Sequence, residues 1–247
     1  SLAYGWFYQD PGYELMVDNN FLQNERASHL ILSFQNTRNG RTLRVEAYYK
    51  KYADLIKYST DEGFQKTAFN NNGNGYATGI DVFWRDDKTI KNGQYWLSYS
   101  YLQTERNYDD YPGLAIPDYT NTHTVSFVYK HWIENWRSLI GMTFQYGSPR
   151  PYNDPNTNGF NQGRLKPFRT LNISWSYLYK QNVIFHASVS NIPGFNNVYG
   201  YNYSPFPNES GVFERTEILP AAKRFFFIGC FITLSKKGEL NQLDKIN

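Results

Sequence analysis

The sequence predicts an all-β protein, an antiparallel transmembrane β-barrel of which about ten strands are present. Three observations lead to this fold class. Apolar and small polar side chains alternate along the predicted strands. Aromatic residues make up 19% of the 247 residues although the mean hydropathy is only -0.64, and short turns alternate with long loops. A barrel in a bilayer needs this combination, because each strand has one side against lipid and one against a watery lumen.

The hairpin at 168–191 has the clearest alternation. On its first arm, bulky residues occupy one face, namely Leu171, Ile173, Trp175, Tyr177 and Tyr179, and Thr170, Asn172, Ser174 and Ser176 occupy the other. After a turn at 180–182, Val183, Phe185, Ala187 and Val189 alternate with His186, Ser188 and Ser190. A half-buried sheet of a soluble protein would also alternate. The polar face of this hairpin, however, carries small polar side chains, whereas the solvent-exposed face of a soluble sheet is usually rich in Lys and Glu.

The predicted strands follow one another in a regular order. They are 3–9, 26–36, 41–58, 73–87, 94–106, 122–132, 136–147, 168–179, 183–191 and 223–235. Short turns fall at 38–41, 88–92, 133–135 and 180–182, and long loops at 10–25, 59–72, 107–121, 148–166 and 192–222. Turns and loops alternate without exception, as in outer-membrane barrels, whereas a sandwich or propeller has no reason to keep that order.

The strand 41–58 predicts which side chains line the lumen. Arg44, Glu46, Tyr48 and Lys50 alternate with Leu43, Val45, Ala47 and Tyr49. We expect the first set to face the lumen together with Asn172, Ser174 and His186. Near the short turns, the sequence also predicts an aromatic girdle made of Trp84, Trp96, Trp132, Trp136 and Tyr179.

Composition and motifs argue against several other classes. The net charge of +3 is small and the basic residues are scattered along the chain, so the sequence shows no basic patch of the kind that binds nucleic acid. No apolar run reaches the roughly 18 residues of a membrane helix. The single Cys230 and the unpaired histidines predict neither a metal site nor a cofactor. Phosphate-loop and nucleophile motifs are missing, so no catalytic residue and no enzyme activity are expected.

The long loops carry the candidate ligand-binding residues. Loops that face the solvent are usually polar, so aromatic side chains on them indicate a function, and one such function is binding of a ligand by stacking. The candidates are Tyr108, Tyr111, Tyr119, Tyr152, Phe160, Tyr199, Tyr201 and Tyr203. Arg150 and Arg164, with Lys166, could hold an anionic ligand such as a ferric chelate. The alternative is that the aromatic residues pack loop against loop and the cations pair with nearby Asp residues.

Several segments resemble TonB-dependent outer-membrane receptors, most closely those of the Bacteroidetes type. These are 5–11 (GWFYQDP), 44–52 (RVEAYYKKY), 72–81 (NGNGYATGID, with Asp81 in place of the usual Glu), 95–101 (YWLSYSY), 189–192 (VSNI) and 224–231. Each segment alone is an aromatic strand sequence of low specificity. Together, however, the segments cover most of the chain and occur in the same order as in the family.

The resemblance implies that 1–235 is the C-terminal part of a barrel of about 22 strands, and that 236–247 is a polar tail. It implies an outer-membrane receptor that takes up a siderophore, vitamin or glycan, contacts outer-membrane lipid, and draws energy from the TonB complex through an N-terminal plug region. The polar tail departs from the terminal aromatic of many such barrels. Two alternatives remain, a self-contained ten-stranded pore or surface enzyme and a soluble carbohydrate-binding module.

Overall fold

The computed structural model describes residues 1–16, 21–61 and 65–234. Within these ranges, ten strands form one antiparallel sheet in which every neighbour along the sheet is the next of these strands in the chain. The strands are β1 (Leu2–Gln9), β2 (Glu25–Arg38), β3 (Arg41–Thr60), β4 (Lys66–Asp86), β5 (Gly93–Asn107), β6 (His123–Ile133), β7 (Ser138–Gly147), β10 (Phe168–Lys180), β11 (Val183–Ser190) and β14 (Phe225–Ile232).

Smaller elements lie in the connections. Two hairpins are β8 (Pro151–Tyr152) with β9 (Gly163–Arg164), and β12 (Gly200–Tyr203) with β13 (Arg215–Ile218). A single helical turn, α1 (Tyr13–Met16), follows β1, and a 3-10 turn, η1 (Glu134–Trp136), joins β6 to β7. None of these hairpins or helical turns was predicted, because each is too short to show a period in the sequence.

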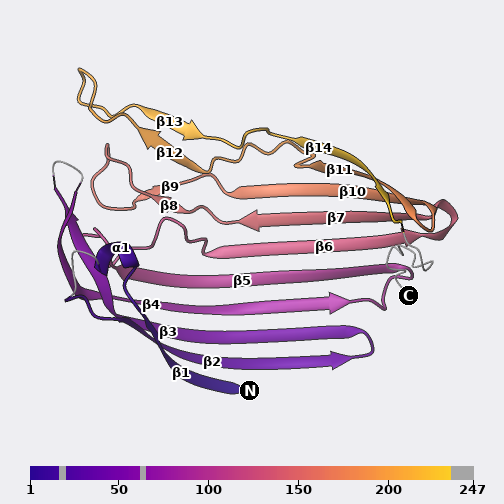
Figure 1. Cartoon of the computed structure of the whole chain (residues 1–247), viewed down its shortest axis with the longest axis horizontal. Coiled ribbons are helices and arrows are strands. Elements are labelled where there is room, and N and C mark those ends of the chain that lie inside the picture. The colour runs from indigo at the N-terminus through magenta and orange to yellow at the C-terminus, as the bar shows by residue number, and fades with distance from the viewer. Residues whose placement is uncertain (17–20, 62–64, 235–247) are drawn as a thin grey trace.

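The short turns lie at one end of the sheet and the long connections at the other (Figure 1). The turns β2–β3, β4–β5, β6–β7 and β10–β11 share the right-hand end of that view, and both small hairpins lie at the left. This confirms the alternation expected from the sequence, and with it the antiparallel barrel-type fold. Asn39 and Gly40 both have positive φ in the β2–β3 turn, as the Asn-Gly pair predicts.

The predicted loop at 59–72 was wrong. Strand β3 continues to Thr60 and β4 begins at Lys66, so most of that segment is a hairpin that extends past its neighbours. The register shifts along this extension, and Asp54 and Ala68 adopt positive φ. Such irregularities in the ladder tolerate Asn and Gly, which is why the Asn-rich segment looked like a loop. Residues 62–64 lie outside the described part.

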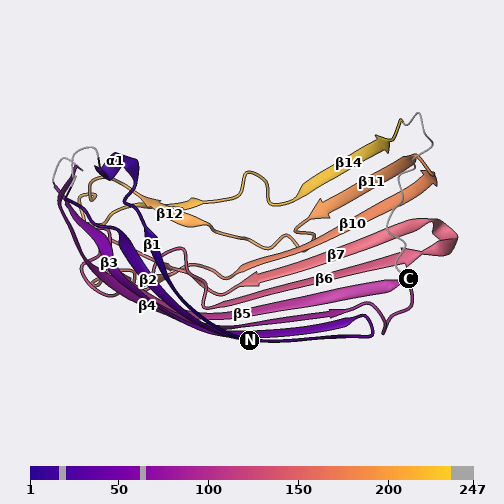
Figure 2. The same cartoon turned by 60° about the horizontal axis from the view of Figure 1, so that its bottom comes forward.

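The sheet is curved (Figure 2), and its two faces differ in chemistry. One face is apolar along every strand, with Phe34, Val45 and Val82 in neighbouring positions. Many of its large side chains are open to the surroundings, for example Leu32 at 58% and Phe34 at 57%. An apolar surface that extends over ten strands is unfavourable in water and fits an apolar medium.

The predicted aromatic girdle was partly wrong. Trp84 and Tyr179 lie on the apolar face near the short turns, and Trp136 in η1 is 65% exposed. Trp96 and Trp132 lie on the opposite face, because they pair with Arg85 and Leu139 in the polar register. The alternation of side chains along each strand already places Trp96 and Trp132 on the polar face, whereas the nearness of a residue to a turn does not determine its face. On the apolar face their places are taken by tyrosines, among them Tyr95, Tyr129 and Tyr177.

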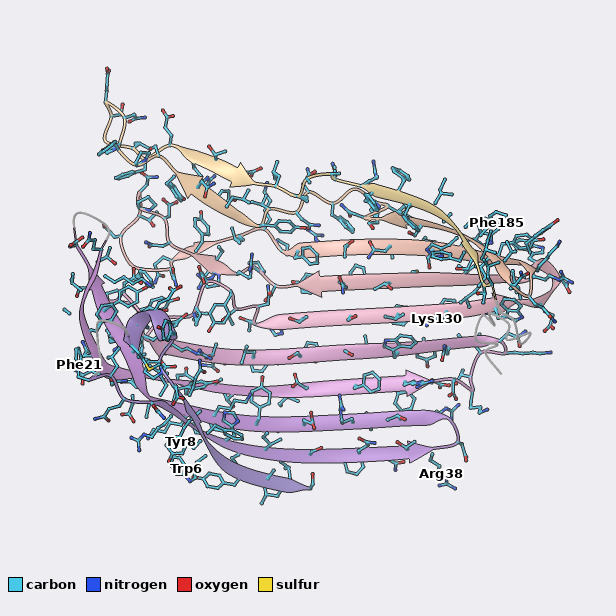
Figure 3. The ribbon with its side chains drawn as sticks, in the orientation of Figure 1. Trp6, Tyr8, Phe21, Arg38, Lys130 and Phe185 are labelled. Carbon is cyan, nitrogen blue, oxygen red and sulfur yellow. The ribbon has the colours of Figure 1, made fainter. Side chains whose placement is uncertain are left out.

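Strands β1 and β14 are the two edges of the described sheet, and they do not pair with each other. Trp6 and Tyr8 project from the edge strand β1, and Arg38 lies at the short-turn end of β2 (Figure 3). Strand β14 is apolar on both faces, as predicted, and Cys230 on it is exposed. The predicted polar tail at 236–247, and Ser235 before it, lie outside the described residues.

Across the described part of the chain, no helix is long and apolar enough to cross a membrane.

Candidate ligand-binding site

The polar face of the sheet carries all the side chains that the sequence places in a lumen. On β3, Glu46 lies opposite Asp81 of β4, which in turn lies opposite Ser100 of β5. The Ser100 hydroxyl donates a hydrogen bond to Asp81 Oδ1. The remaining predicted residues share this face through the continuous register of the sheet, namely Arg44, Tyr48, Lys50, Asn172, Ser174 and His186.

This polar face is the concave side of the sheet. A cavity of about 230 Å³ spans β3 to β6 and is lined by side chains of the polar face, including Arg44, Glu46 and Ser126. A hollow that spans four neighbouring strands forms on the side toward which a sheet curves, whereas the side chains of the opposite side spread apart. The concave, polar and convex, apolar faces are those that a barrel wall requires.

A second cavity, of about 340 Å³, continues toward the long-loop end. Tyr48, Lys50 and Arg106 line it from the strands, and Tyr119 and Thr120 line it from the loop 107–121, which therefore folds inward over the sheet. Lys50 Nζ lies 5.1 Å from the ring centroid of Tyr48, and Arg106 Cζ lies 4.3 Å from that of Tyr52. These cation–π contacts hold the positive charges against the wall.

A third cavity, of about 370 Å³, lies where β6, β7 and β10 reach the long loops. Arg150, Lys166, Phe168 and Tyr199 line it. Arg150 Nη2 donates a hydrogen bond of 2.8 Å to the Tyr199 carbonyl oxygen, and the Phe168 and Tyr199 rings lie 6.4 Å apart. Lys166 forms an ion pair of 3.3 Å with Glu217. The site therefore combines two cations with two aromatic rings.

These cavities form one hollow along the concave face. Thr124 lines all three of them, Ser126 is common to the first and third, and Asn121 to the second and third. We call their union the concave-face hollow. Its acidic residues, Glu46 and Asp81, lie between the strands beside Arg44, whereas its four other cations lie closer to the loops, namely Lys50, Arg106, Arg150 and Lys166. An anionic ligand approaching from the loop end would therefore meet positive charge first.

Other predicted binding residues form a separate cluster between the two hairpins. The rings of Tyr152 and Tyr201 lie 4.8 Å apart, and Arg215 Cζ lies 4.2 Å from the Tyr201 centroid. Arg215 Nη1 donates to the Tyr152 hydroxyl at 3.2 Å. Burial, with smaller contributions from Asp154 and Tyr152, raises the pKa of Tyr203 to about 12. This cluster joins the two hairpins, so its tyrosine rings act in packing between them.

Tyr108 and Tyr111 pack within the loops. Their rings lie 4.7 Å apart, Tyr111 lies 4.6 Å from Phe160, and Tyr111 is buried. This is the loop-on-loop packing that the sequence left open as an alternative. The same loop is fastened to β3, because the Asp109 N–H donates to the Ile56 carbonyl at 2.8 Å. Burial raises the pKa of the Asp109 carboxyl above its ordinary value.

Arg164 lies on the same small hairpin that follows Arg150, but its side chain lines a different cavity. It lines a cavity of about 430 Å³ with Phe160 and Ile116, and its Nη1 donates to the Asn161 and Gly163 carbonyl oxygens. The predicted binding set is thus divided among separate places, and of its members Tyr119, Arg150, Lys166 and Tyr199 line the concave-face hollow. Sequence reasoning missed Phe168, although its alternation with Arg169 and Leu171 places it on the polar face. The sequence named Tyr119 among the loop aromatic residues, but only the folding of the loop places it over the sheet.

Within the described ranges, no group of three or more His, Cys, Asp or Glu side chains could hold a metal ion. His186 instead contacts the Ser176 hydroxyl through Nδ1 at 2.8 Å and lies beside Phe227, with ring centroids 6.0 Å apart. His186 therefore packs within the polar face of the sheet.

Searches against protein-family models and against curated proteins gave no match. Solved structures do match. The ferric-catecholate import receptor Fiu of E. coli K12 is 13% identical, with a TM-score of 0.65 over 94% of this chain and 32% of that chain. The ferric yersiniabactin uptake receptor FyuA of Yersinia pestis is 13% identical, with a TM-score of 0.63 over 94% and 34%.

This chain has the fold of a TonB-dependent receptor barrel. The copper transporter OprC agrees, at 15% identity and a TM-score of 0.66 over 94% of this chain and 37% of that chain. The chain spans about a third of the length of the solved structures it matches. The open edges β1 and β14 fit this, since part of a TonB-dependent receptor barrel leaves the sheet unclosed. The structural neighbours are outer-membrane receptors, as the sequence led us to expect.

Proposed function

We propose that this chain forms part of an outer-membrane receptor that takes up a scarce nutrient with energy derived from TonB. The observation that carries the proposal is the concave-face hollow, which runs from the strands to the long loops with cations and aromatic rings at its loop end. The barrel-type fold supports this function, and the described strands do not close into a self-contained ten-stranded pore.

The chemistry of the loop end favours an anionic ligand that carries rings or other flat groups. Arg150 offers a planar guanidinium suited to carboxylate or catecholate oxygens, and Lys166 adds a second charge. Phe168 and Tyr199 offer faces for stacking. A ferric chelate has this chemistry, whereas an uncharged oligosaccharide would use the aromatic rings alone. The plug domain and the TonB complex are the partners this mode of uptake requires.

The function is tested by transport in cells that produce the full-length native protein. Radioactive iron would be supplied as its citrate and catecholate complexes, with a labelled neutral oligosaccharide as the third probe. We expect uptake of an iron complex that stops when a protonophore collapses the inner-membrane potential. Uptake that continues under the protonophore would show passive flow instead, and selective uptake of the oligosaccharide would overturn the anionic assignment.

The hollow itself is tested by Lys166→Gln and Arg150→Gln. Losing a charge-assisted hydrogen bond costs about 1.5–3 kcal/mol, so each change should raise the Kd of the transported complex roughly tenfold or more. Lys91→Gln, in the turn at the opposite end, is the matched control and should leave the Kd unchanged. Equal affinities for all these proteins would mean that the ligand does not use this end of the hollow.

A further inference from the structure

The segment 115–122 runs back along strand β5 and covers the second cavity of the concave-face hollow. Arg106 and Ala115 exchange backbone hydrogen bonds of 2.9 and 3.0 Å, and the Leu102 N–H donates to the Thr122 carbonyl oxygen at 2.9 Å. Strand β5 has a neighbour on each side, so this cavity lies in the interior of the sheet and away from its open edges. The loop is therefore fixed over the strand at both ends of the segment.

Thr120 is held in this segment by a turn. Its N–H donates to the carbonyl oxygen of Pro117 at 3.1 Å, and Pro117 itself is fully buried. Thr120 lines the second cavity and is only 4% exposed. Its hydroxyl oxygen is buried and has no hydrogen-bond partner in the protein. A buried hydroxyl without a partner is unfavourable, so it indicates a group that the site receives from outside.

Arg106 has an unpaired donor on the strand side of the same cavity. Its Nε is buried without a hydrogen-bond partner, although its Cζ lies 4.3 and 5.8 Å from the ring centroids of Tyr52 and Tyr108. A cation–π contact supplies no acceptor in the plane of the guanidinium, so the rings leave this N–H unsatisfied. Among the described residues, five buried side-chain polar atoms lack a partner, and two of the five belong to Arg106 and Thr120.

The charge of this cavity is positive. Of the described residues that line it, Lys50 and Arg106 are the charged ones, and neither forms an ion pair within the described ranges. The neighbouring cavity differs, because Glu46 and Asp81 line it beside Arg44. Two cations and two unpaired donors without an acidic residue suit an oxyanion, whose oxygen atoms accept several charge-assisted hydrogen bonds.

We propose that Lys50, Arg106 and Thr120 form a second anion position in the concave-face hollow, which takes a carboxylate or phosphate group of the ligand. This inference rests on the proposed function, because it assigns the anion to the molecule that is taken up. The position is separate from Arg150 and Lys166, which line the third cavity. A ligand that occupies both positions carries at least two anionic groups.

Binding at this position requires a small movement of the loop 107–121. Neither Arg106 Nε nor Thr120 Oγ1 is open to solvent, so an anion reaches both atoms only when the loop shifts to admit it. Once bound, the anion joins the loop to β5 by hydrogen bonds. We therefore expect inorganic phosphate to slow amide hydrogen exchange in 115–122 of the full-length native protein, and to leave exchange in β10 unchanged.

The main test measures binding of inorganic phosphate to the full-length protein by isothermal titration calorimetry. The parent variant is Arg150→Gln/Lys166→Gln, which removes the cations of the third cavity and should still bind phosphate. In this background, Lys50→Gln and Arg106→Gln should each raise the Kd of phosphate roughly tenfold, because each removes a charge-assisted hydrogen bond. A parent variant that binds no phosphate, or an unchanged Kd in both further variants, would overturn the position.

Two substitutions of Thr120 separate recognition from folding. Valine has nearly the shape of threonine but no hydroxyl, so Thr120→Val should weaken phosphate binding about tenfold while the Tm stays the same or rises. Thr120→Ser keeps the hydroxyl and should bind phosphate like the parent variant. Normal binding by Thr120→Val would mean that the buried hydroxyl does not contact the anion, and the assignment of Thr120 would fail.

The matched control is Lys130→Gln. Lys130 lies on the same polar face toward the short-turn end (Figure 3), and its Nζ lies 5.5 Å from the ring centroid of Trp96. Like Lys50, it is a cation held near an aromatic ring, but it lies outside the three cavities of the hollow. Its substitution should leave phosphate binding unchanged. A loss equal to that of Lys50→Gln would mean that phosphate responds only to the net charge of the face.

The iron citrate complex separates this inference from the proposed function. Phosphate should compete with iron citrate for the native protein, and Arg106→Gln should weaken the binding of both. Uptake of iron citrate that stops under the protonophore, by a protein whose second cavity binds no phosphate, would overturn this inference alone. Phosphate binding that does not affect iron citrate would also overturn it, because the position would then take a free anion. Phosphate binding without energy-dependent uptake of any probe would overturn the proposed function instead.

Discussion

Ile173 and Ser174 are neighbours in the chain, yet their side chains lie in environments of opposite polarity. Ile173 lies on the convex face between Met142 and Val189, and it is 38% exposed there. Ser174 lies on the concave face, where Gly141 leaves room beside its hydroxyl. The period of two along a strand makes this one-residue step a step from the apolar face to the polar face, which in the proposed barrel are the lipid and lumen sides.

A single charge placed at these two positions should therefore have unequal effects. Ile173→Arg should lower the free energy of unfolding by about 2–4 kcal/mol if the position lies near the middle of the bilayer, whereas Ser174→Arg should change it little. Denaturant titration of the protein in lipid vesicles measures both. Equal losses would refute the assignment of the two faces.

At the scale of elements, the loops 148–166 and 192–222 behave as one unit rather than as two. Asn156 Nδ2 donates to the Phe213 carbonyl at 3.0 Å, and the Phe213 N–H donates to Asn156 Oδ1 at 2.8 Å. This pair resembles a sheet ladder between a side chain and a backbone. With the Tyr152–Tyr201–Arg215 cluster and the Arg150–Tyr199 bond, it couples one lining segment of the hollow to the other.

Asn156→Ala should uncouple the two loops while leaving the sheet intact. Two hydrogen bonds of about 1 kcal/mol each are lost, so the amide of Phe213 should exchange its hydrogen faster by roughly tenfold or more. Hydrogen-exchange mass spectrometry measures this directly. Asn153→Ala, at an exposed position of the same loop, serves as the control. Unchanged exchange in the Asn156 variant would mean that the aromatic cluster alone holds the loops together.

At the scale of the whole molecule, the separation of short turns from long loops gives the sheet a direction relative to the membrane. The exposed Glu209 lies in the connection between β12 and β13, whereas Lys91 lies in the turn between β4 and β5 at the other end (Figure 1). In outer-membrane barrels, long loops face the exterior and short turns face the periplasm. The two positions should therefore lie on opposite sides of the outer membrane.

Cysteine labelling on intact cells tests this direction. In a Cys230→Ser background, Glu209→Cys should react with a membrane-impermeant maleimide, and Lys91→Cys should react only after the outer membrane is opened. Labelling of Lys91→Cys on intact cells, with Glu209→Cys protected, would reverse the orientation and place the concave-face hollow's cationic end in the periplasm.

The sequence by itself determined the strands, their antiparallel order and the face of each side chain. These are local properties, because a period of two residues and the length of a connection can be read within one segment. Arg44, Glu46 and Lys50 were assigned to the polar face on that basis alone. The errors also have a local cause: the Asn-rich segment of β4 resembles a loop, and Trp96 was judged by its distance from a turn instead of by its period.

Only the tertiary structure decided which loop residues meet. Tyr152 contacts Tyr201, Arg150 contacts Tyr199, and Tyr111 contacts Phe160, each pair coming from different connections or from distant parts of the chain. No periodic pattern encodes such contacts, since they depend on how loops without regular structure fold over the curved sheet. For the same reason, the seven loop tyrosines that looked alike in the sequence divide into packing residues and two, Tyr119 and Tyr199, that line the concave-face hollow.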